Sequence, residues 1–187
     1  MASAKRDHLI DTALRLFGRD GYHAVGIDRV IAEAGVARMT LYNHFKSKDE
    51  LILAVLHRRD ERFRNSFMRQ VERAAPDPKG RILATFDALD AWFASDDFTG
   101  CMFINAAAEY SDKNDPIHRT AREHKDLVVD YLRDLASKAG AADPDGLAAG
   151  LALLTEGAIV MAHVAGHKDA ARKAKTAAEV LIRDAGL

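Results

Sequence analysis

The sequence predicts an all-α protein in which an N-terminal three-helix domain, built around a helix-turn-helix, is joined by a long helix to a larger helical domain. Three observations support this fold class: the composition is rich in Ala with only 4 Pro, apolar residues recur at helical spacing, and several of these stretches end at Gly or Pro. Hydrophobic residues make up 48% of the 187 and charged residues 29%, which is ordinary for a globular protein. We expect domains over residues 1–47 and 48–187, with the linking helix over residues 48–75.

The first helix is predicted from about residue 4 to residue 20. Leu9, Ala13, Leu16 and Phe17 form one apolar stripe, and Gly21 follows as a stop signal. We expect this helix to close a three-helix core over the segment that follows.

Residues 27–45 predict two short helices joined by a tight turn. Apolar residues repeat at helical spacing from Ile27 to Ala34, Gly35 interrupts the pattern, and Leu41 and Phe45 resume it four residues apart. Gly35 suits a helix end because a residue without a side chain adopts a left-handed backbone at no steric cost. The pattern indicates a helix-turn-helix, which places its second helix in the major groove of DNA.

The predicted reading surface is what remains exposed when Leu41 and Phe45 point inward. Arg38 is the first choice for direct base reading, because a guanidinium can bond two acceptors of guanine at once. Thr40 offers a hydroxyl and a methyl for thymine or phosphate, and Asn43 either reads adenine or is solvated at the helix edge. The whole surface comprises Ala37, Arg38, Met39, Thr40, Tyr42, Asn43 and His44.

The run GVARMTLYNHFKSKDEL resembles the DNA-binding domain of the TetR family of bacterial transcriptional repressors, and the similarity covers residues 5–55 or so. The run combines the turn glycine and valine, a Leu-Tyr pair, a His-Phe pair and a Lys-Ser-Lys junction at one fixed spacing. The resemblance implies a homodimer that binds a palindromic double-stranded DNA operator and a C-terminal domain whose small, largely apolar effector releases the DNA. It also implies that Tyr42, His44 and Lys48 contact phosphates, with Lys46 as an assistant.

Gly26 departs from the family pattern, which usually has Thr or Ser at this position to cap the second helix and touch a phosphate. Only backbone N–H groups remain at the helix start. Arg29 is the candidate replacement as a phosphate ligand.

Charge is distributed unequally along the chain, although the net charge is only -1. Residues 1–75 contain 14 Lys and Arg against 10 Asp and Glu, a net charge of +4, and the remaining residues contain 13 against 18, a net charge of -5. The helix-turn-helix lies in the basic half, and a positive charge is what binding to phosphate requires.

The linking helix has its own start and stop signals. Ser47 and Glu50 form a capping box, in which each side chain satisfies a backbone donor at the helix start. The arginines between residues 58 and 73 alternate with acidic residues, which favours a solvated face with local ion pairs over a second nucleic-acid surface. Pro76 and Pro78 end the helix.

Five further helices are predicted after Pro78, two of which begin at Asp-Pro pairs, near residues 117–139 and after residue 143. The apolar stretch 147–164 is interrupted by Thr155, Glu156 and His163, so we expect a buried helix and no membrane span. The resemblance places a four-helix dimer interface on the last two helices, although the same residues could simply fill the protomer core. The interface candidates are Leu151, Leu154, Ala158, Val180 and Leu181.

The C-terminal domain has material for a largely apolar pocket with a few polar anchors, although aromatic and Met residues at helical spacing are more often ordinary core. The apolar candidates are Trp92, Phe93, Phe98, Met102, Phe103, Tyr131 and Met161. The polar candidates are Asn105, His124, Glu156 and His163.

Other kinds of site find little support in the sequence. Only His163 and His167 have the interval that sets two metal ligands on one helical turn, and Gly166 interrupts them, so we expect no metal site. Cys101 is interpreted as a buried apolar residue. Because no phosphate loop or nucleophile elbow is present, we predict no enzyme activity and no cofactor.

Two functions follow from these patterns. The first is a dimeric transcriptional repressor released by an effector, and the alternative is a helical enzyme or ligand carrier in which the helix-turn-helix is only a packing module. The exposed polar edge from Arg38 to Lys48 favours the first. With no secretory signal and a single Cys, we expect the protein to be cytoplasmic and not bound to a membrane.

Overall fold

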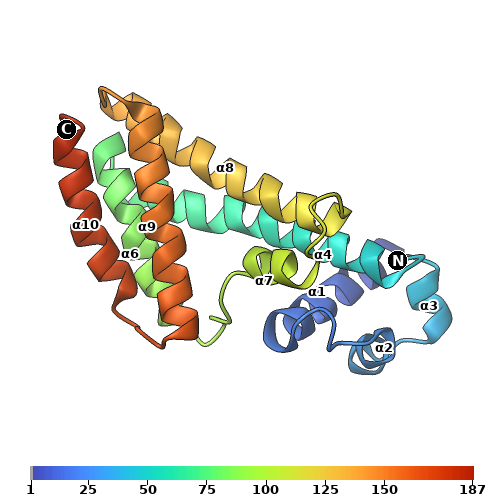
Figure 1. The fold of residues 1–187 in the computed structure, drawn as a ribbon. Helices are drawn as coiled ribbons and strands as arrows, with labels where there is room; N and C mark the ends of the chain where they lie inside the picture. Colours follow the sequence, from blue (N-terminus) through green and yellow to red (C-terminus); the bar gives the residue numbers. More distant parts are fainter. Residues whose placement is uncertain (1) are drawn as a thin grey trace. The chain divides into compact units, whose positions relative to one another are not determined.

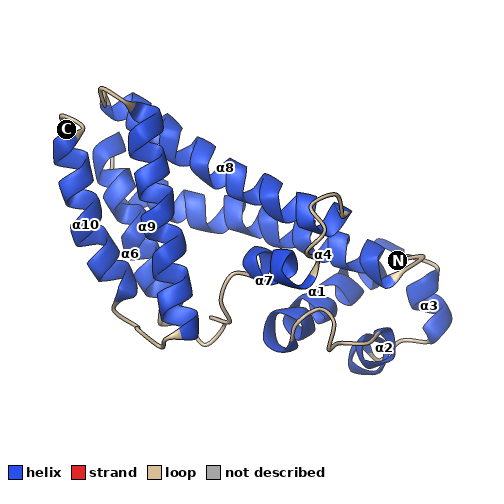
Figure 2. Ribbon diagram, viewed as in Figure 1, coloured by secondary structure: helices blue, strands red, loops and turns tan. Residues whose placement is uncertain are grey.

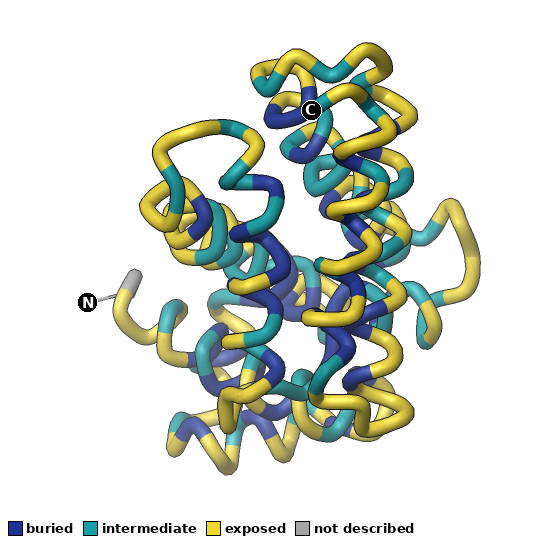
Figure 3. Tube along the Cα trace, turned by 90° about the vertical axis from the view of Figure 1, so that its left-hand side faces the viewer, coloured by how far each residue is buried: buried dark blue, intermediate teal, exposed yellow. Residues whose placement is uncertain are grey.

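The computed structural model describes residues 2–187, and its regular elements in that range are helices, with no strand among them (Figure 2). Buried and exposed residues alternate along these helices, as expected for amphipathic elements (Figure 3). The all-α fold class predicted from the sequence is confirmed. In chain order the helices are α1 (Ala2–Asp20), α2 (Ile27–Ala34), α3 (Arg38–Tyr42), α4 (Lys48–Arg62), η1 (Phe63–Met68), α5 (Arg69–Ala74), α6 (Pro78–Phe93), α7 (Met102–Glu109), α8 (Pro116–Ala139), α9 (Pro144–Val164) and α10 (Ala170–Asp184) (Figure 1).

The chain forms two compact units. Unit 1 comprises Met1–Arg62 and Cys101–His124, and unit 2 comprises Phe63–Gly100 and Lys125–Leu187. This grouping differs from the expected division at residue 47, because α4 packs along α1 and because α7 contacts the segment that follows α1. The functional division into residues 1–47 and 48–187 stays a prediction.

Unit 1 is organised around α1, which packs against α2, α3 and α4. The predicted stripe is correct, since Leu9, Leu16 and Phe17 are buried. Their burial removes the apolar face of α1 from water and so drives the packing of the neighbouring helices.

Two arginines of α4 form ion pairs with aspartates of α1. Arg58 contacts Asp7 at 2.5 Å and Asp11 at 3.2 Å, and Arg62 contacts Asp11 at 2.7 Å. The sequence predicted local ion pairs on a solvated face, and Arg58 does lie near Glu61 at 3.8 Å. The closer partners are on α1, which shows that this face is partly an interhelical one.

The long linking helix is interrupted. Between α4 and α5 lies the π-helical segment η1, in which Phe63 and Phe67 stack with ring centroids 5.0 Å apart. A π-helical segment replaces the i→i+4 hydrogen bonds of an α-helix by i→i+5 bonds, so the α-helical pattern is broken between α4 and α5. The sequence predicted a single helix because two aromatic residues four apart also suit an α-helix.

Two helices of unit 2, α6 and α9, begin at a proline that follows a capping Asp. Asp77 precedes Pro78, and its carboxylate accepts from the Gly80 N–H at 2.8 Å. Asp143 precedes Pro144 in the same way, and its carboxylate accepts from the Gly146 N–H at 3.0 Å. Helices α6, α9 and α10 pack against one another (Figure 1). The five helices predicted after Pro78 are therefore confirmed.

One buried cluster in unit 2 contains an unusual polar atom. Phe67 and Tyr131 pack against the buried residues Val71, Ala84 and Ala88. Burial raises the pKa of Tyr131 to about 12, and its buried hydroxyl has no hydrogen-bond partner within the described part of the chain. A buried hydroxyl without a partner loses its hydrogen bonds to water without compensation.

Replacing Tyr131 with Phe should therefore leave the free energy of unfolding unchanged or raise it by up to about 1 kcal/mol. Tyr22→Phe is the matched control, because the Tyr22 hydroxyl donates to the Met102 carbonyl at 3.0 Å. That control should lower the free energy of unfolding by about 1–3 kcal/mol, since it leaves a buried acceptor without its donor. Urea unfolding of the two variants measures both effects, and equal losses would contradict the prediction.

Candidate nucleic-acid interface

The turn between α2 and α3 has the predicted geometry. Gly35 has φ 62° and ψ 34°, in the left-handed region, and the N–H groups of Gly35 and Val36 donate to the carbonyls of Ala32 and Ile31. These bonds satisfy carbonyls at the end of α2 that lack helical partners. The helix-turn-helix in the sequence is confirmed.

Helix α3 is anchored on one side and open on the other. Leu41 and Phe45 are buried, whereas Met39 is 68% exposed and Tyr42 is 42% exposed. The remaining predicted reading residues divide into two groups, since Ala37, Arg38 and Asn43 are exposed whereas Thr40 and His44 are half-buried. The anchoring pair thus leaves an exposed edge of mainly polar residues, with Ala37 and Met39 among them, available to a ligand.

Two of the predicted DNA-binding arginines already have acidic partners. Arg38 forms an ion pair with Asp28, and Arg29 contacts Asp20 at 2.7 Å. A hydrogen bond from Arg19, together with Arg29, lowers the pKa of Asp20 below its ordinary value. Because both partners of the Arg38 pair are largely exposed, this ion pair is weak, and a phosphate or base can replace the carboxylate.

The junction before α4 is a capping box in which the Glu50 side chain binds the N–H of Lys46 instead of that of Ser47. The Glu50 N–H donates to Ser47 Oγ at 3.1 Å, and Glu50 Oε2 accepts from the Lys46 N–H at 2.7 Å. Lys48 lies half-buried in the first turn of α4, and its Nζ is 3.5 Å from the His23 carbonyl. The helix start and Lys48 together form a site suited to an anion.

Sequence reasoning missed the role of α7 in this unit. The carboxylate of Glu109, at the end of α7, accepts from the backbone N–H groups of Tyr22 and His23. Tyr22 is fully buried, and burial raises the pKa of its hydroxyl. The only sequence signal was a Glu at the end of an otherwise apolar segment, which does not identify its partner.

The residues predicted to line a pocket fall into both units. In unit 1, Phe103 stacks on His124 with ring centroids 3.7 Å apart, and His124 Nδ1 lies 2.8 Å from Asp60. Met102 is buried in the same unit, where Asn105 is half-buried. These contacts are those of a packed core that includes a buried histidine.

In unit 2 the predicted pocket residues form separate groups. Trp92, Phe93 and Phe98 contact one another, and Phe98 lies edge-on to His163 at 6.1 Å. Glu156 is paired with Lys125 at 2.7 Å, whereas Met161 is exposed and Tyr131 belongs to the cluster described above. The pocket stays a prediction.

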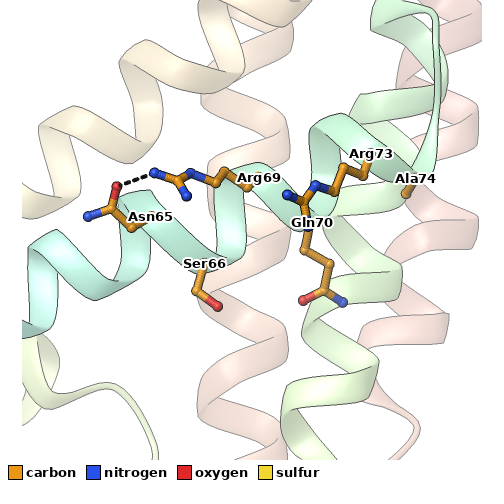
Figure 4. Close-up of a pocket in the computed structure, with 6 residues that line it drawn as sticks. All are labelled: Asn65, Ser66, Arg69, Gln70, Arg73 and Ala74. Carbon is orange, nitrogen blue, oxygen red and sulfur yellow. Dashed lines mark hydrogen bonds between the residues drawn. The ribbon is translucent and has the colours of Figure 1, made fainter.

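An open depression of about 460 Å³ lies elsewhere in unit 2, and none of the predicted pocket residues lines it (Figure 4). Arg69 donates to Asn65 across it at 3.1 Å. Its lining residues come from η1 and α5 and are Asn65, Ser66, Arg69, Gln70, Arg73 and Ala74. All six are exposed, so the depression is a feature of the helix surface and no enclosed ligand cavity.

The predicted dimer residues are only partly on the surface. Leu151 and Ala158 are buried within the protomer, where α9 packs on α6 and α10, and the dimer interface itself stays a prediction. Leu154 and Leu181 are half-buried, and Val180 is exposed. The large apolar residues that α9 does expose are Leu153, Val160, Met161 and Val164, which we call the α9 stripe.

Helix α9 is also long and apolar enough to cross a membrane, although 39% of its most apolar window is buried inside the protein. Within residues 2–187 no group of three His, Cys, Asp or Glu side chains is placed to hold a metal ion. Cys101 is buried, as expected.

A helix-turn-helix that exposes a polar edge on its second helix, followed by further helices, defines the class of helix-turn-helix DNA-binding regulators. Residues 9–55 match the family described as bacterial regulatory proteins, tetR family, and residues 78–178 match the tetracyclin repressor-like C-terminal domain. The chain belongs to the TetR family, whose members are DNA-binding transcriptional regulators and not enzymes.

Similar proteins agree with this assignment. A TetR-family transcriptional regulator of Streptomyces coelicolor has a known structure that is 34% identical, with a TM-score of 0.92 over 99% of this chain and 97% of that one. The transcriptional activator FasR of Mycolicibacterium smegmatis is 40% identical over 84 residues, which are 45% of this chain and 38% of FasR. The regulator LmrA of Bacillus subtilis is 30% identical over 120 residues, 63% of each chain, so both matches span less than two thirds of the relative.

Two glycines of the interface should respond to substitution with opposite signs. A Cβ at Gly26 or at Gly35 meets no atom within 4 Å, so backbone conformation decides the outcome. Gly35→Ala should lower the free energy of unfolding by about 1 kcal/mol, because its φ is positive. Gly26→Ser should raise it by about 0.5 kcal/mol, because the extended backbone of Gly26 suits a capping hydroxyl. Thermal unfolding of both variants tests this, and a shared sign would contradict it.

Proposed function

We propose that the protein is a dimeric repressor that binds a palindromic operator and is released by a small, largely apolar effector. The observation that carries this proposal is the polar edge of α3, exposed beside Lys48 in a helix-turn-helix of the TetR family. A repressor needs only to occupy its operator, so this edge and a partner subunit suffice. FasR is an activator, and a promoter-reporter assay with the gene deleted distinguishes repression from activation.

The DNA contacts divide into two roles. Arg38 reads a base, aided by Thr40 or Asn43, because a guanidinium matches the two acceptors of guanine. Tyr42, His44 and Lys48 fix the position of α3 through phosphates, which carry no sequence information directly. Met39 and Ala37 are exposed beside Arg38 and supply apolar contact to the groove, while Arg29 and Lys46 add positive charge.

A second copy of the chain covers the α9 stripe. Leu153 and Val164 are 75% and 77% exposed, which is costly for large apolar side chains on one helix face. A Cβ at Gly157, which lies between them on α9, meets no atom within 4 Å, so another helix can approach closely. Two recognition helices held in this way can reach successive major grooves of a palindrome.

The effector binds in the C-terminal domain. The buried hydroxyl of Tyr131, without a partner in the described chain, supports this because a ligand could supply the missing hydrogen bond. The aromatic cluster of Trp92, Phe93 and Phe98 supports an apolar ligand. The rival function, a helical carrier or enzyme, leaves the exposed edge of α3 without a purpose. We also propose that the protein acts in the cytoplasm, where it would meet its operator DNA.

The function is tested by mobility shift of the purified protein on DNA from around its own gene, across salt concentrations and with unlabelled competitor. Selection from a random library supplies a fragment if the neighbouring DNA contains none. Tight binding to one palindrome, weakening as salt rises, supports the proposal. Binding without preference on every fragment contradicts it. Compounds that release the DNA are then screened as effectors.

Substitutions in α3 and α4 should separate base reading from phosphate binding. Lys48→Ala and Tyr42→Phe should weaken binding to all sequences, with a lower salt slope for Lys48→Ala. Arg38→Ala should weaken binding to the operator by about 10-fold or more and relax the preference at one base pair. Mobility shifts on the operator and on its single-base variants measure this. Equal losses on every sequence for all three variants would contradict the assigned roles.

Charge on the α9 stripe should dissociate the dimer. Leu153→Glu should weaken dimerisation by about 30-fold or more, because a carboxylate would be buried in an apolar interface. Ser137→Glu, at an exposed position of α8, is the control and should leave the dimer intact. Sedimentation equilibrium measures both, and an unchanged dimer in Leu153→Glu would remove the α9 stripe from the interface.

A further inference from the structure

The carboxylate of Glu109 is bound by the segment that joins α1 to α2. Glu109 Oε1 accepts from the Tyr22 N–H at 2.8 Å, and Oε2 accepts from the His23 N–H at 2.5 Å. The side chain is only 25% exposed, so these charge-assisted bonds are partly shielded from water. Two successive backbone N–H groups therefore share one carboxylate from a residue 86 or 87 positions away.

The conformation of Gly21 brings these two N–H groups to the same side. Its φ is +84°, and a Cβ placed there would lie 3.0 Å from Glu109 Oε1. Successive N–H groups next to a left-handed residue form a concavity that binds anions. Here the anion is a side chain of α7, and only a glycine leaves room for it.

Aromatic packing holds the same segment against α7. The Tyr22 ring packs edge-on to Tyr110 at 6.4 Å, and its hydroxyl donates to the Met102 carbonyl at the other end of α7. The His23 ring lies 4.8 Å from Tyr110, and its Nδ1 is 3.4 Å from Glu109 Oε2. Tyr22 thus contacts α7 at both ends of that helix, and His23 contacts its C-terminal end.

This segment lies next to the parts that would contact DNA. The His23 carbonyl faces Lys48 Nζ at 3.5 Å, and Gly26 is the N-cap of α2 without any side-chain cap. The start of α2 is therefore positioned by the preceding turn and not by its own capping residue. Glu109 binds the N–H of His23, and Lys48 lies at the carbonyl of the same residue.

We infer that Glu109 is a positioning residue for DNA binding: its carboxylate fixes the turn at residues 21–23, and so the start of α2 and the site of Lys48, in the geometry that specific recognition requires. This inference rests on the proposed function and deepens it. Helix α7 would then contribute to DNA binding, although it is about 80 residues away from the turn in sequence.

Charge and position predict opposite results for the substitution Glu109→Gln. Removal of a negative charge from a DNA-binding unit should, by charge alone, tighten binding to all DNA. Loss of positioning should instead weaken specific binding, because one N–H group loses its acceptor and faces an amide donor. Binding to random DNA depends on charge and should not weaken.

The experiment measures the binding of intact protein to its selected operator fragment and to random DNA, for the wild type, Glu109→Gln, Glu109→Asp and Glu123→Gln. Glu123 is exposed on α8 in the same unit, so Glu123→Gln is a control with the same change of charge. Amide proton shifts and hydrogen exchange of Tyr22 and His23 by NMR report the contact itself. Circular dichroism confirms that each variant is folded.

We expect Glu109→Gln to weaken operator binding by about 10-fold, the effect of losing one charge-assisted hydrogen bond, with binding to random DNA equal or tighter. The two amide signals should shift upfield and exchange faster, and Glu123→Gln should show none of this. A folded Glu109→Gln protein that binds the operator as the wild type does would overturn the inference while leaving the proposed function intact.

If Glu109→Gln does not fold, Glu109→Asp decides, because it keeps the charge and withdraws the carboxylate by one methylene. Weaker operator binding with altered Tyr22 and His23 amides supports the inference, and altered amides with unchanged operator binding overturn it. A wild-type protein that prefers no DNA over competitor overturns the proposed function, and this inference with it.

Discussion

The burial of Leu41 and Phe45 is the constraint on which the DNA-binding surface depends. These two side chains lie four residues apart on one side of α3 and its extension, so their burial against unit 1 fixes the rotation of a helix only five residues long. A helix this short would not be stable alone in water. Its outer edge is exposed as a direct result, and each functional assignment to Arg38, Thr40 or Tyr42 assumes that rotation.

The sequence was most informative where a signal is local. Gly35, the Asp-Pro helix starts and the stripe of α1 each depend on a few neighbouring residues, and all were predicted correctly. Contacts over long sequence distances were not predictable in this way. Glu109 and Tyr22 have no pattern that pairs them, and the acidic partners of Arg58 are on another helix, so the spacing along α4 could not identify them.

Spacing along the sequence also could not predict which apolar residues of α9 are buried. Its apolar residues cover most of the helix circumference, so spacing alone does not say which of them pack on α10 and which remain exposed. Leu151 and Leu153 differ by two positions and point to opposite environments, the first fully buried and the second 75% exposed. The members of the predicted pocket were chosen by residue type alone, and they lie in two units, so the pocket stays a prediction.

The ion pair between Arg38 and Asp28 bears on how tolerant the operator can be. An arginine that loses its guanine normally remains buried in the groove without a partner, and this cost is what rejects a wrong base. Here the guanidinium can return to Asp28, which also lies on the exposed surface of the helix-turn-helix. If Arg38 reads a base as proposed, the carboxylate would serve as a reserve acceptor and would lower the free-energy penalty of a wrong base pair at that position. Regulation of several promoters with imperfect copies of one site is compatible with such an arginine.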